Sequence, residues 1–439
     1  MTKKVFSLLI LLILIADLNQ ADAYLDPGMG SMLIQGLIAV GVGVAYTLKL
    51  YWNQVKGFFI SYPYEWSFSQ LKSAGLLTLD ICRRSLQHGM ILKDASAYNV
   101  QFHHNTPTFI DTLSFDMYHE GAPWVAYRQF CQHFLAPLSL IAYTDHRLSQ
   151  LFRIYIDGAP LDLTSTLLPY KTWFSFPLMS HLHLHAKSQR QYANTSKQRI
   201  KAGWLRVSKK GLLGLLDSLQ KAIEAMQWQM HGSEWGAYYD ETNYTPRAFA
   251  HKRHQVRHMV QRVAPRLVWD LGANTGVFSE IAANEGAYVI SWDVDAVAVE
   301  KHYLTLRQKD QGSILPLVLD LANPNGGMGW ANAERDSLEA RGPVDLVMAL
   351  ALIHHLVISN HVPLHLIAAF FSRLGKTLLI EFVPKTDSQV QRLLATRKDI
   401  FEAYTQENFE AEFGHYFELM ECASVKESER TLYLFKRKR

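Results

Sequence analysis

The chain has 439 residues, with 44 Lys and Arg against 40 Asp and Glu, and a net charge of +4. This length is enough for two soluble domains, and so balanced a charge gives no electrostatic case for nucleic-acid binding. Cys82, Cys131 and Cys422 are far apart and have no metal-binding or redox spacing. They exclude a disulfide scaffold and favour a reducing compartment, and we expect no metal site.

The N-terminal residues are strongly apolar. Two lysines precede the run FSLLILLILIA, and the small-residue triplet ADA follows, which is typical of a signal peptide or signal anchor. Residues 28–48 are uncharged and long enough to cross a bilayer, with Lys49 and Lys56 behind them. The positive-inside rule then places the rest of the chain in the cytoplasm, whether or not the first run is cleaved. We predict a signal or anchor and transmembrane segment over residues 1–56; the alternatives are a buried hairpin or a mis-started reading frame.

Residues 57–232 are predicted to form a mixed accessory domain rich in aromatic side chains. Two of its segments, ILKDASAYNVQF and TPTFIDTLSF, place Asp94 and Asn99 five residues apart and Asp111 at the end of an apolar strand. Residues 210–230 have the pattern of an amphipathic helix and mark the predicted boundary before a third domain.

The third predicted domain, residues 233–439, contains the segment LVWDLGANTG. An apolar run suited to a buried parallel strand leads into a glycine-rich turn, and a helical pattern follows. Small residues in such a turn allow the backbone to approach a nucleotide-like ligand outside the carboxyl ends of the strands. The next strand, AYVISWD, ends 21 residues after the first turn glycine, at the spacing of an acid that accepts the hydroxyls of an adenosine ribose. The candidate residues of this region are Asp270, Gly272, Asn274, Gly276 and Asp293.

Three more strands and a hairpin complete the predicted sheet. ILPLVLD ends at Asp320, VDLVMALALIHHL runs into a turn with His354 and His355, and TLLIEFVP ends near Glu381. FELMECASV and RTLYLFK, joined by the charged turn KESE, have the pattern of a closing hairpin. Helical patterns lie between most of the strands, so we predict an α/β fold.

The motif LVWDLGANTG and the strands after it resemble class I S-adenosylmethionine-dependent methyltransferases over residues 238–439. The resemblance implies a Rossmann-like sheet of seven strands, the last antiparallel, with S-adenosylmethionine as the cofactor. It implies that the turn holds the methionine part, Asp293 the ribose and Asp320 the adenine amino group. The middle glycine of the usual turn is Asn274 here, which the left-handed backbone still tolerates. The soluble chain as a whole is similar to bacterial, nodulation-protein-related methyltransferases that carry both the KDASxYN-like and LALIHHL segments.

Each candidate residue also has a structural interpretation. The alternative ligand for the turn is NAD, which is less favoured because the third phosphate-binding glycine is missing. Asp320 would cap a turn, Glu381 would be a solvated strand-end carboxylate, and the His354–His355 pair would be structural. The segment around residues 91–115 resembles the catalytic loop of kinase-like phosphotransferases, although no phosphate-binding loop precedes it and too few residues remain for a nucleotide-binding lobe. We favour a structural role for Asp94, Asn99 and Asp111.

The sequence therefore predicts a methyltransferase tethered to the inner membrane of a bacterium, with its soluble domains in the cytoplasm. A sulfonium methyl group is already activated, so catalysis is mainly positioning and desolvation, and His354 or His355 would act as the base if the acceptor must lose a proton. We expect the segment WGAYYDETNY to close over the cofactor, and a small-molecule, lipid or glycan acceptor. The alternatives are a non-catalytic adenosine-ligand-binding membrane protein, and a phosphotransferase centred on Asp94, Asn99 and Asp111.

Overall fold

The structure, a computed structural model, divides the chain into two compact units, Met1–Phe59 and Ile60–Arg439. The predicted signal and membrane segment lies outside the residues that are described. No helix of the described residues is long and apolar enough to span a membrane. The described residues are 59–187, 206–230, 244–395 and 397–438.

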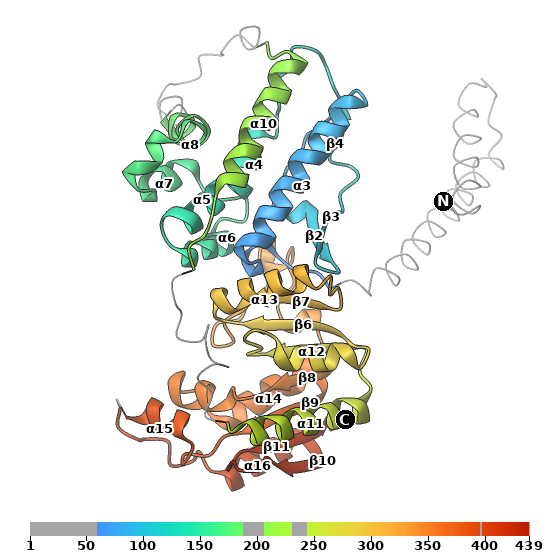
Figure 1. Cartoon of the computed structure of the whole chain (residues 1–439), viewed down its shortest axis with the longest axis vertical. Coiled ribbons are helices and arrows are strands. Elements are labelled where there is room, and N and C mark those ends of the chain that lie inside the picture. Colours follow the sequence, from blue (N-terminus) through green and yellow to red (C-terminus); the bar gives the residue numbers. More distant parts are fainter. Residues whose placement is uncertain (1–58, 188–205, 231–243, 396, 439) are drawn as a thin grey trace, which may run out of the picture. The chain divides into compact units, whose positions relative to one another are not determined.

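The accessory region is mostly helical, and its longest helix, α3 (Phe68–Gln87), packs along α10 (Lys209–Ala225), as Figure 1 shows. Both begin where a serine accepts a backbone hydrogen bond from the first turn, Ser67 for α3 and Ser208 for α10. The amphipathic helix predicted near 210–230 is therefore confirmed. The remaining helical elements are η2 (Pro63–Glu65), η3 (Ala97–Asn99), α4 (Tyr127–Phe130), η4 (Cys131–Leu135), α5 (Ala136–Tyr143), η5 (His146–Gln150), α6 (Leu151–Ile154), α7 (Leu161–Leu167), η6 (Tyr170–Phe174), α8 (Phe176–Leu178) and η7 (Met179–Leu184).

Two short antiparallel pairs carry the kinase-like segment. Strand β1 (Met90–Leu92) pairs with β4 (Phe115–Met117), and β2 (Val100–His103) pairs with β3 (Thr106–Phe109). The turn with Asp94 and Asn99 therefore lies between β1 and β2, and Asp111 lies between β3 and β4.

The C-terminal part is built on a seven-stranded sheet with the order β10-β11-β9-β8-β5-β6-β7. The neighbouring pairs from β7 to β9 are parallel, and β11 is antiparallel to both of its neighbours. The predicted seven-stranded α/β sheet with an antiparallel last strand is confirmed. Its strands are β5 (Leu267–Leu271), β6 (Tyr288–Asp293), β7 (Ile314–Val318), β8 (Val344–Ala349), β9 (Gly375–Phe382), β10 (Phe417–Ser424) and β11 (Thr431–Arg437).

Helices between the strands bury the sheet. In β5 and β6 all residues except the first are buried, and the rings of Trp269 and Trp292 meet edge to face with centroids 6.2 Å apart. Continuous burial of this kind is expected of central parallel strands, which are covered on both faces. The helical elements of this part are α11 (Pro246–Val263), α12 (Val277–Asn284), α13 (Ala296–Gln308), η8 (Trp330–Asn332), η9 (Glu339–Arg341), η10 (His355–Ser359), α14 (Leu364–Leu374), α15 (Ser388–Leu394) and α16 (Gln406–Tyr416).

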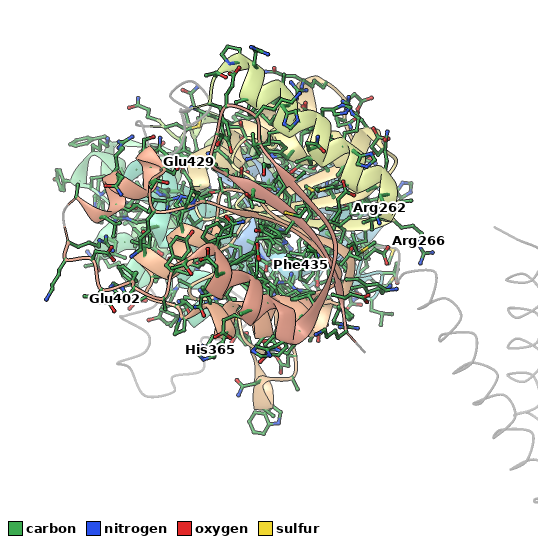
Figure 2. The ribbon with its side chains drawn as sticks, turned by 90° about the horizontal axis from the view of Figure 1, so that it is seen from below. Arg262, Arg266, His365, Glu402, Glu429 and Phe435 are labelled. Carbon is green, nitrogen blue, oxygen red and sulfur yellow. The ribbon has the colours of Figure 1, made fainter. Side chains whose placement is uncertain are left out.

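The closing hairpin is anchored by aromatic packing. Phe435 on β11 has ring contacts with Phe409, Phe413 and Phe417, with centroids about 6 Å apart. In Figure 2 Phe435 lies near the middle of the view, whereas Arg262 of α11 lies toward its side. The predicted hairpin is confirmed, and this packing fixes the edge of the sheet opposite β7.

Candidate active site

The glycine-rich turn after β5 has the left-handed backbone that its sequence predicts. Gly272, Asn274 and Gly276 have φ angles of 76°, 50° and 84°. The amides of Gly272 and Ala273 donate to the Trp292 carbonyl over 2.8 and 2.9 Å, and the Asn274 amide donates to Asp293 Oδ2 over 2.7 Å. The turn after β5 is thereby fastened to the end of β6, and Asn274 replaces glycine in a conformation that asparagine tolerates.

A pocket of about 280 Å³ opens at the carboxyl ends of β5, β6, β7 and β8. Polar groups of the turn and strand ends lie along one part of it, and leucine and phenylalanine side chains form much of the rest. Six of the eight predicted site residues line this pocket, namely Asp270, Gly272, Asn274, Asp293, Asp320 and His355.

Gly276 and His354 do not line the pocket. A Cβ on Gly276 would lie 2.0 Å from the imidazole ring of His302, so this glycine makes room for that ring at the start of α12. His354 is 1% exposed, and burial is the main reason that its pKa lies well below the usual value. Direct contact with a ligand remains a prediction for both residues.

Two carboxyl groups at the pocket have raised pKa values. Asp270 is 2% exposed and Asp293 is 8% exposed; burial raises their pKa values to about 7 and about 6. Ser279 donates to Asp270 over 2.6 Å, and the amides of Asn274 and Asp295 donate to Asp293, which limits both increases. A cationic ligand in this pocket would favour the ionised forms.

The affinity for S-adenosylmethionine is therefore expected to rise as the pH increases through about 6 and 7. Below these values Asp293 and Asp270 are protonated in the free protein, and a cation must displace their protons to bind, so affinity is lost as the pH falls. Calorimetry across this range measures the effect, and Asp270→Asn should flatten the upper part of the curve. An affinity that stays constant or falls with rising pH would contradict this electrostatic account.

An ion pair that the sequence analysis did not identify lies beside the pocket. Lys252 of α11 is 1% exposed and contacts Glu381 of β9, with 2.7 Å between Nζ and Oε2. Glu381 is 0% exposed and also accepts from the Ala351 amide over 2.7 Å. Burial alone would raise the pKa of Glu381, but Lys252 and Arg430 hold it below its usual range. The interpretation of Glu381 as a solvated carboxylate is wrong, because its partners enclose it.

Tyr244 connects this ion pair to the closing hairpin. Its hydroxyl donates to Glu381 and lies 3.2 Å from Lys252 Nζ, and Arg430 Nη1 donates to it over 3.0 Å. Arg430 also forms two hydrogen bonds with the Asp387 carboxylate. Tyr244 lines the pocket, whereas the rest of the segment WGAYYDETNY, residues 235–243, lies outside the described residues.

His355 faces the pocket beside Leu356, Ser359 and Asn360. Burial, with a smaller contribution from the Arg430 charge, lowers the pKa of His355 to about 4. At neutral pH the imidazole is therefore uncharged, and its low pKa makes it a weak proton acceptor.

The loop that follows Asp320 is fastened to the accessory region. Asp320 accepts from the Ala322 amide over 2.8 Å, so it caps a turn and lines the pocket as well. Further along the same loop, Arg341 forms a buried ion pair with Glu65, at 2.6 Å, and the Asp336 amide donates to the Tyr62 hydroxyl over 2.8 Å. The accessory region therefore fixes the far end of the loop that begins at Asp320.

Asp94, Asn99 and Asp111 form hydrogen bonds within their own segment. Asp94 Oδ1 accepts from the Ser96 amide and from Gln129, and Asn99 donates to Ser114, which donates to Asp111. None of the three lines the pocket. Across the described ranges no group of three or more His, Cys, Asp and Glu side chains is suited to a metal ion. The contacts favour the structural interpretation of this segment.

Comparison with known proteins assigns the chain to a family. No protein-family profile matches it. Nodulation protein NoeA of Rhizobium meliloti (strain 1021) is 37% identical over 383 residues, which are 86% of this chain and 80% of NoeA. The chain belongs to the NoeA family. The predicted similarity to nodulation-related proteins is thereby confirmed.

Solved structures match this NoeA-family protein only in part. WbdD matches with a TM-score of 0.32 and 14% identity over 47% of the chain, which spans 43% of WbdD. The magnesium protoporphyrin IX methyltransferase of Synechocystis PCC 6803, solved with bound SAH, matches with a TM-score of 0.33 and 17% identity over 46% of the chain and 92% of its own. A TehB-like SAM-dependent methyltransferase of Corynebacterium glutamicum matches with a TM-score of 0.28 and 17% identity over 42% of the chain and 87% of its own.

The strand order, with β5 and β8 at the centre and β11 inserted antiparallel, is that of the class I methyltransferase fold. The fold predicted from the sequence is confirmed, and S-adenosylmethionine is the cofactor of that fold. The glycine-rich turn, the strand-end carboxylates and the pocket between them fit this cofactor.

Proposed function

We propose that this NoeA-family protein is an S-adenosylmethionine-dependent methyltransferase that is tethered to a membrane. The observation that carries the proposal is the convergence of Asp270, Gly272, Asn274, Asp293 and Asp320 on one pocket at the carboxyl edge of the sheet. These residues come from three different strand ends, and their meeting at one place is what a cofactor with methionine, ribose and adenine parts requires.

Each part of the cofactor has a chemically suitable residue. Asp293 would accept the ribose hydroxyls, because a carboxylate has lone pairs left after its two backbone hydrogen bonds. Asp270 would balance the amino group and Asp320 would receive the adenine amino group. Among the described residues that line the pocket, Lys252 is the one lysine or arginine, so we assign it to the methionine carboxylate.

The chain's own residues would do three things during transfer. When bound, S-adenosylmethionine supplies a methyl group on a sulfonium, and the neutral thioether that remains after transfer is a good leaving group. Leucine side chains and Phe249 and Phe278 line the pocket and would exclude water from the reacting atoms. His355, with Ser359 and Asn360, would orient the acceptor, and the neutral His355 ring would take its proton where one is released.

The acceptor class remains a proposal. A membrane-tethered enzyme meets small molecules, lipids and envelope glycans at the bilayer, and we infer that the acceptor is one of these. Mass spectrometry of extracts from cells with and without the protein tests this directly. We expect one compound to gain the mass of a methyl group only when the protein is present, and complementation with Asp293→Ala should not restore it. Identical extracts would argue for a non-catalytic ligand-binding protein.

The orientation in the membrane is a separate proposal. Lys49 and Lys56 follow the uncharged stretch at residues 28–48, so the catalytic part should face the cytoplasm, where the cofactor is made. A reporter fused after Arg439 is expected to be active only in a form that works in the cytoplasm. Activity of a disulfide-dependent periplasmic reporter at that position would reverse the assignment.

The variant Asp111→Asn distinguishes a structural role of the kinase-like segment from the phosphotransferase alternative. If Asp94, Asn99 and Asp111 only fasten turns, the variant should lose at most about 1–3 kcal/mol of stability with the Ser114 hydrogen bond and keep its cofactor affinity. Titration with magnesium and ATP should show no saturable binding in either protein. Saturable binding by the wild type that disappears in Asp111→Asn would establish a second active site.

A further inference from the structure

The accessory region exposes a cluster of large apolar side chains that the proposed reaction does not use. Phe174, Tyr170 and Phe176 are 80%, 76% and 70% exposed, far more than aromatic side chains in a soluble fold normally are. Their neighbours in η6, α7 and η7 are partly exposed as well. We name this surface the aromatic patch; it consists of Leu167, Tyr170, Trp173, Phe174, Phe176 and Leu184.

The aromatic patch is supported by packed helices and by hydrogen bonds of a buried histidine. Helix α8 continues directly into η7, and both α7 and η6 pack on η7; Figure 1 shows α7 and α8 near each other. Beneath the aromatic side chains, His183 bonds Ser165 over 2.7 Å and Thr172 over 2.9 Å, and its ring stacks on Trp173. The exposed rings are therefore presented by a hydrogen-bonded scaffold, as a binding surface requires.

The sequence that carries the aromatic patch is poor in acidic residues, which favours an anionic partner. Residues 161–187 contain one acidic residue, Asp162, whereas Lys171 lies in η6 beside Tyr170 and Lys187 follows η7 in the sequence. From Lys187 to Lys210 the sequence has eight Lys and Arg residues and no Asp or Glu. Proteins that bind at a lipid headgroup layer combine these side chains. Tyrosine, tryptophan and lysine lie at the level of the headgroups, and phenylalanine and leucine are buried among the acyl chains.

We propose that the aromatic patch docks on the surface of a bilayer that contains anionic phospholipid. Ten residues separate the uncharged stretch at 28–48 from Phe59, which limits the reach to about 35 Å. A tether this short keeps the accessory region close to any membrane that the stretch enters. The docking surface does not depend on methyl transfer, and it would remain if the pocket proved to have another use.

Site-specific fluorescence on the full chain tests the proposal. Cys82 and Cys131 are buried, so Cys422→Ser removes the exposed thiol, and an environment-sensitive nitrobenzoxadiazole label is then placed at Phe174→Cys. The matched control carries the label at Leu419→Cys, an apolar residue of β10 that is 53% exposed. Because both proteins have the same N-terminal stretch, a difference between them reports on the patch and not on the anchor.

In vesicles of phosphatidylcholine with phosphatidylglycerol, the label at position 174 should shift to the blue and lose most of its quenching by iodide. The label at 419 should change little, and Lys171→Glu should weaken the shift at 174. If position 174 stays as accessible to iodide as position 419, the proposal is wrong. Protection of the label at position 174 from iodide before vesicles are added would also contradict the proposal, because another protein surface would then cover the aromatic patch.

Discussion

Replacing Lys252 by Met is expected to lower the free energy of unfolding by about 3–5 kcal/mol. Methionine fills most of the space of the lysine stem but leaves Glu381 as a buried carboxylate without its ion-pair partner. Glu381 would keep the hydrogen bonds from Tyr244 and the Ala351 amide, which do not supply a compensating charge. Urea denaturation of the wild type and the variant measures the difference.

Two further variants test whether the loss of stability comes from the buried ion pair and not from the removal of a lysine as such. Lys376→Met removes a lysine that forms an exposed pair with Asp345 on the same sheet, and it should cost no more than about 1 kcal/mol. The double variant Lys252→Met with Glu381→Gln should recover part of the lost stability, because no buried charge is left unpaired. A Lys252→Met protein as stable as Lys376→Met would show that Lys252 and Glu381 do not form this buried pair in solution.

Asp293→Ala is expected to weaken S-adenosylmethionine binding by roughly a hundredfold or more. Two charge-assisted hydrogen bonds to the ribose would be lost, each worth about 1.5–3 kcal/mol. The variant also frees the amides of Asn274 and Asp295, which Asp293 now holds, so the turn itself would be less ordered. Calorimetry of the purified full chain measures the affinity.

The matched control for this change is Asp295→Ala, two residues further on. Asp295 caps α13 by accepting from the Val297 amide, and it does not line the pocket. Its loss should cost about 0.5–2 kcal/mol of stability and leave cofactor affinity nearly unchanged. Equal losses of affinity in the two variants would remove Asp293 from the list of direct cofactor contacts.

Much of the cofactor side of the pocket was predictable, because strand ends and glycine-rich turns leave local signals. The alternating strands and helices predicted the sheet, and Asn274 was correctly identified as a residue that keeps the left-handed turn. Asp293 and Asp320 were found from their places after apolar runs. Gly276 shows the limit of such patterns: it belongs to the same motif, but in the fold it makes room for the His302 ring.

The buried ion pair was not predictable in the same way. Lys252 and Glu381 are 129 residues apart and meet only when α11 packs beside β9. A signal did exist, since Lys252 interrupts the buried face that Ala248 and Val256 form on α11, each four residues away. A lysine on such a face needs a buried anionic partner, but the sequence does not say which of the 40 acidic residues provides it.

The contacts between the accessory region and the loop after Asp320 were missed for a similar reason. Glu65 and Arg341 are 276 residues apart, and nothing near either residue indicates the other. The predicted boundary at residue 232 remains a prediction, and the contacts that join the two sides of it leave no local signal in the sequence.

Methyl transfer by the purified full chain is the most direct test of the proposed function. The protein, supplied with S-adenosylmethionine labelled in its methyl group, is incubated with lipid and polar extracts of cells that lack it, and the label in each fraction is counted. We predict transfer into one fraction by the wild type, and almost none by Asp293→Ala. Saturable cofactor binding without transfer into any fraction would contradict the assignment as a methyltransferase and support a non-catalytic binding protein.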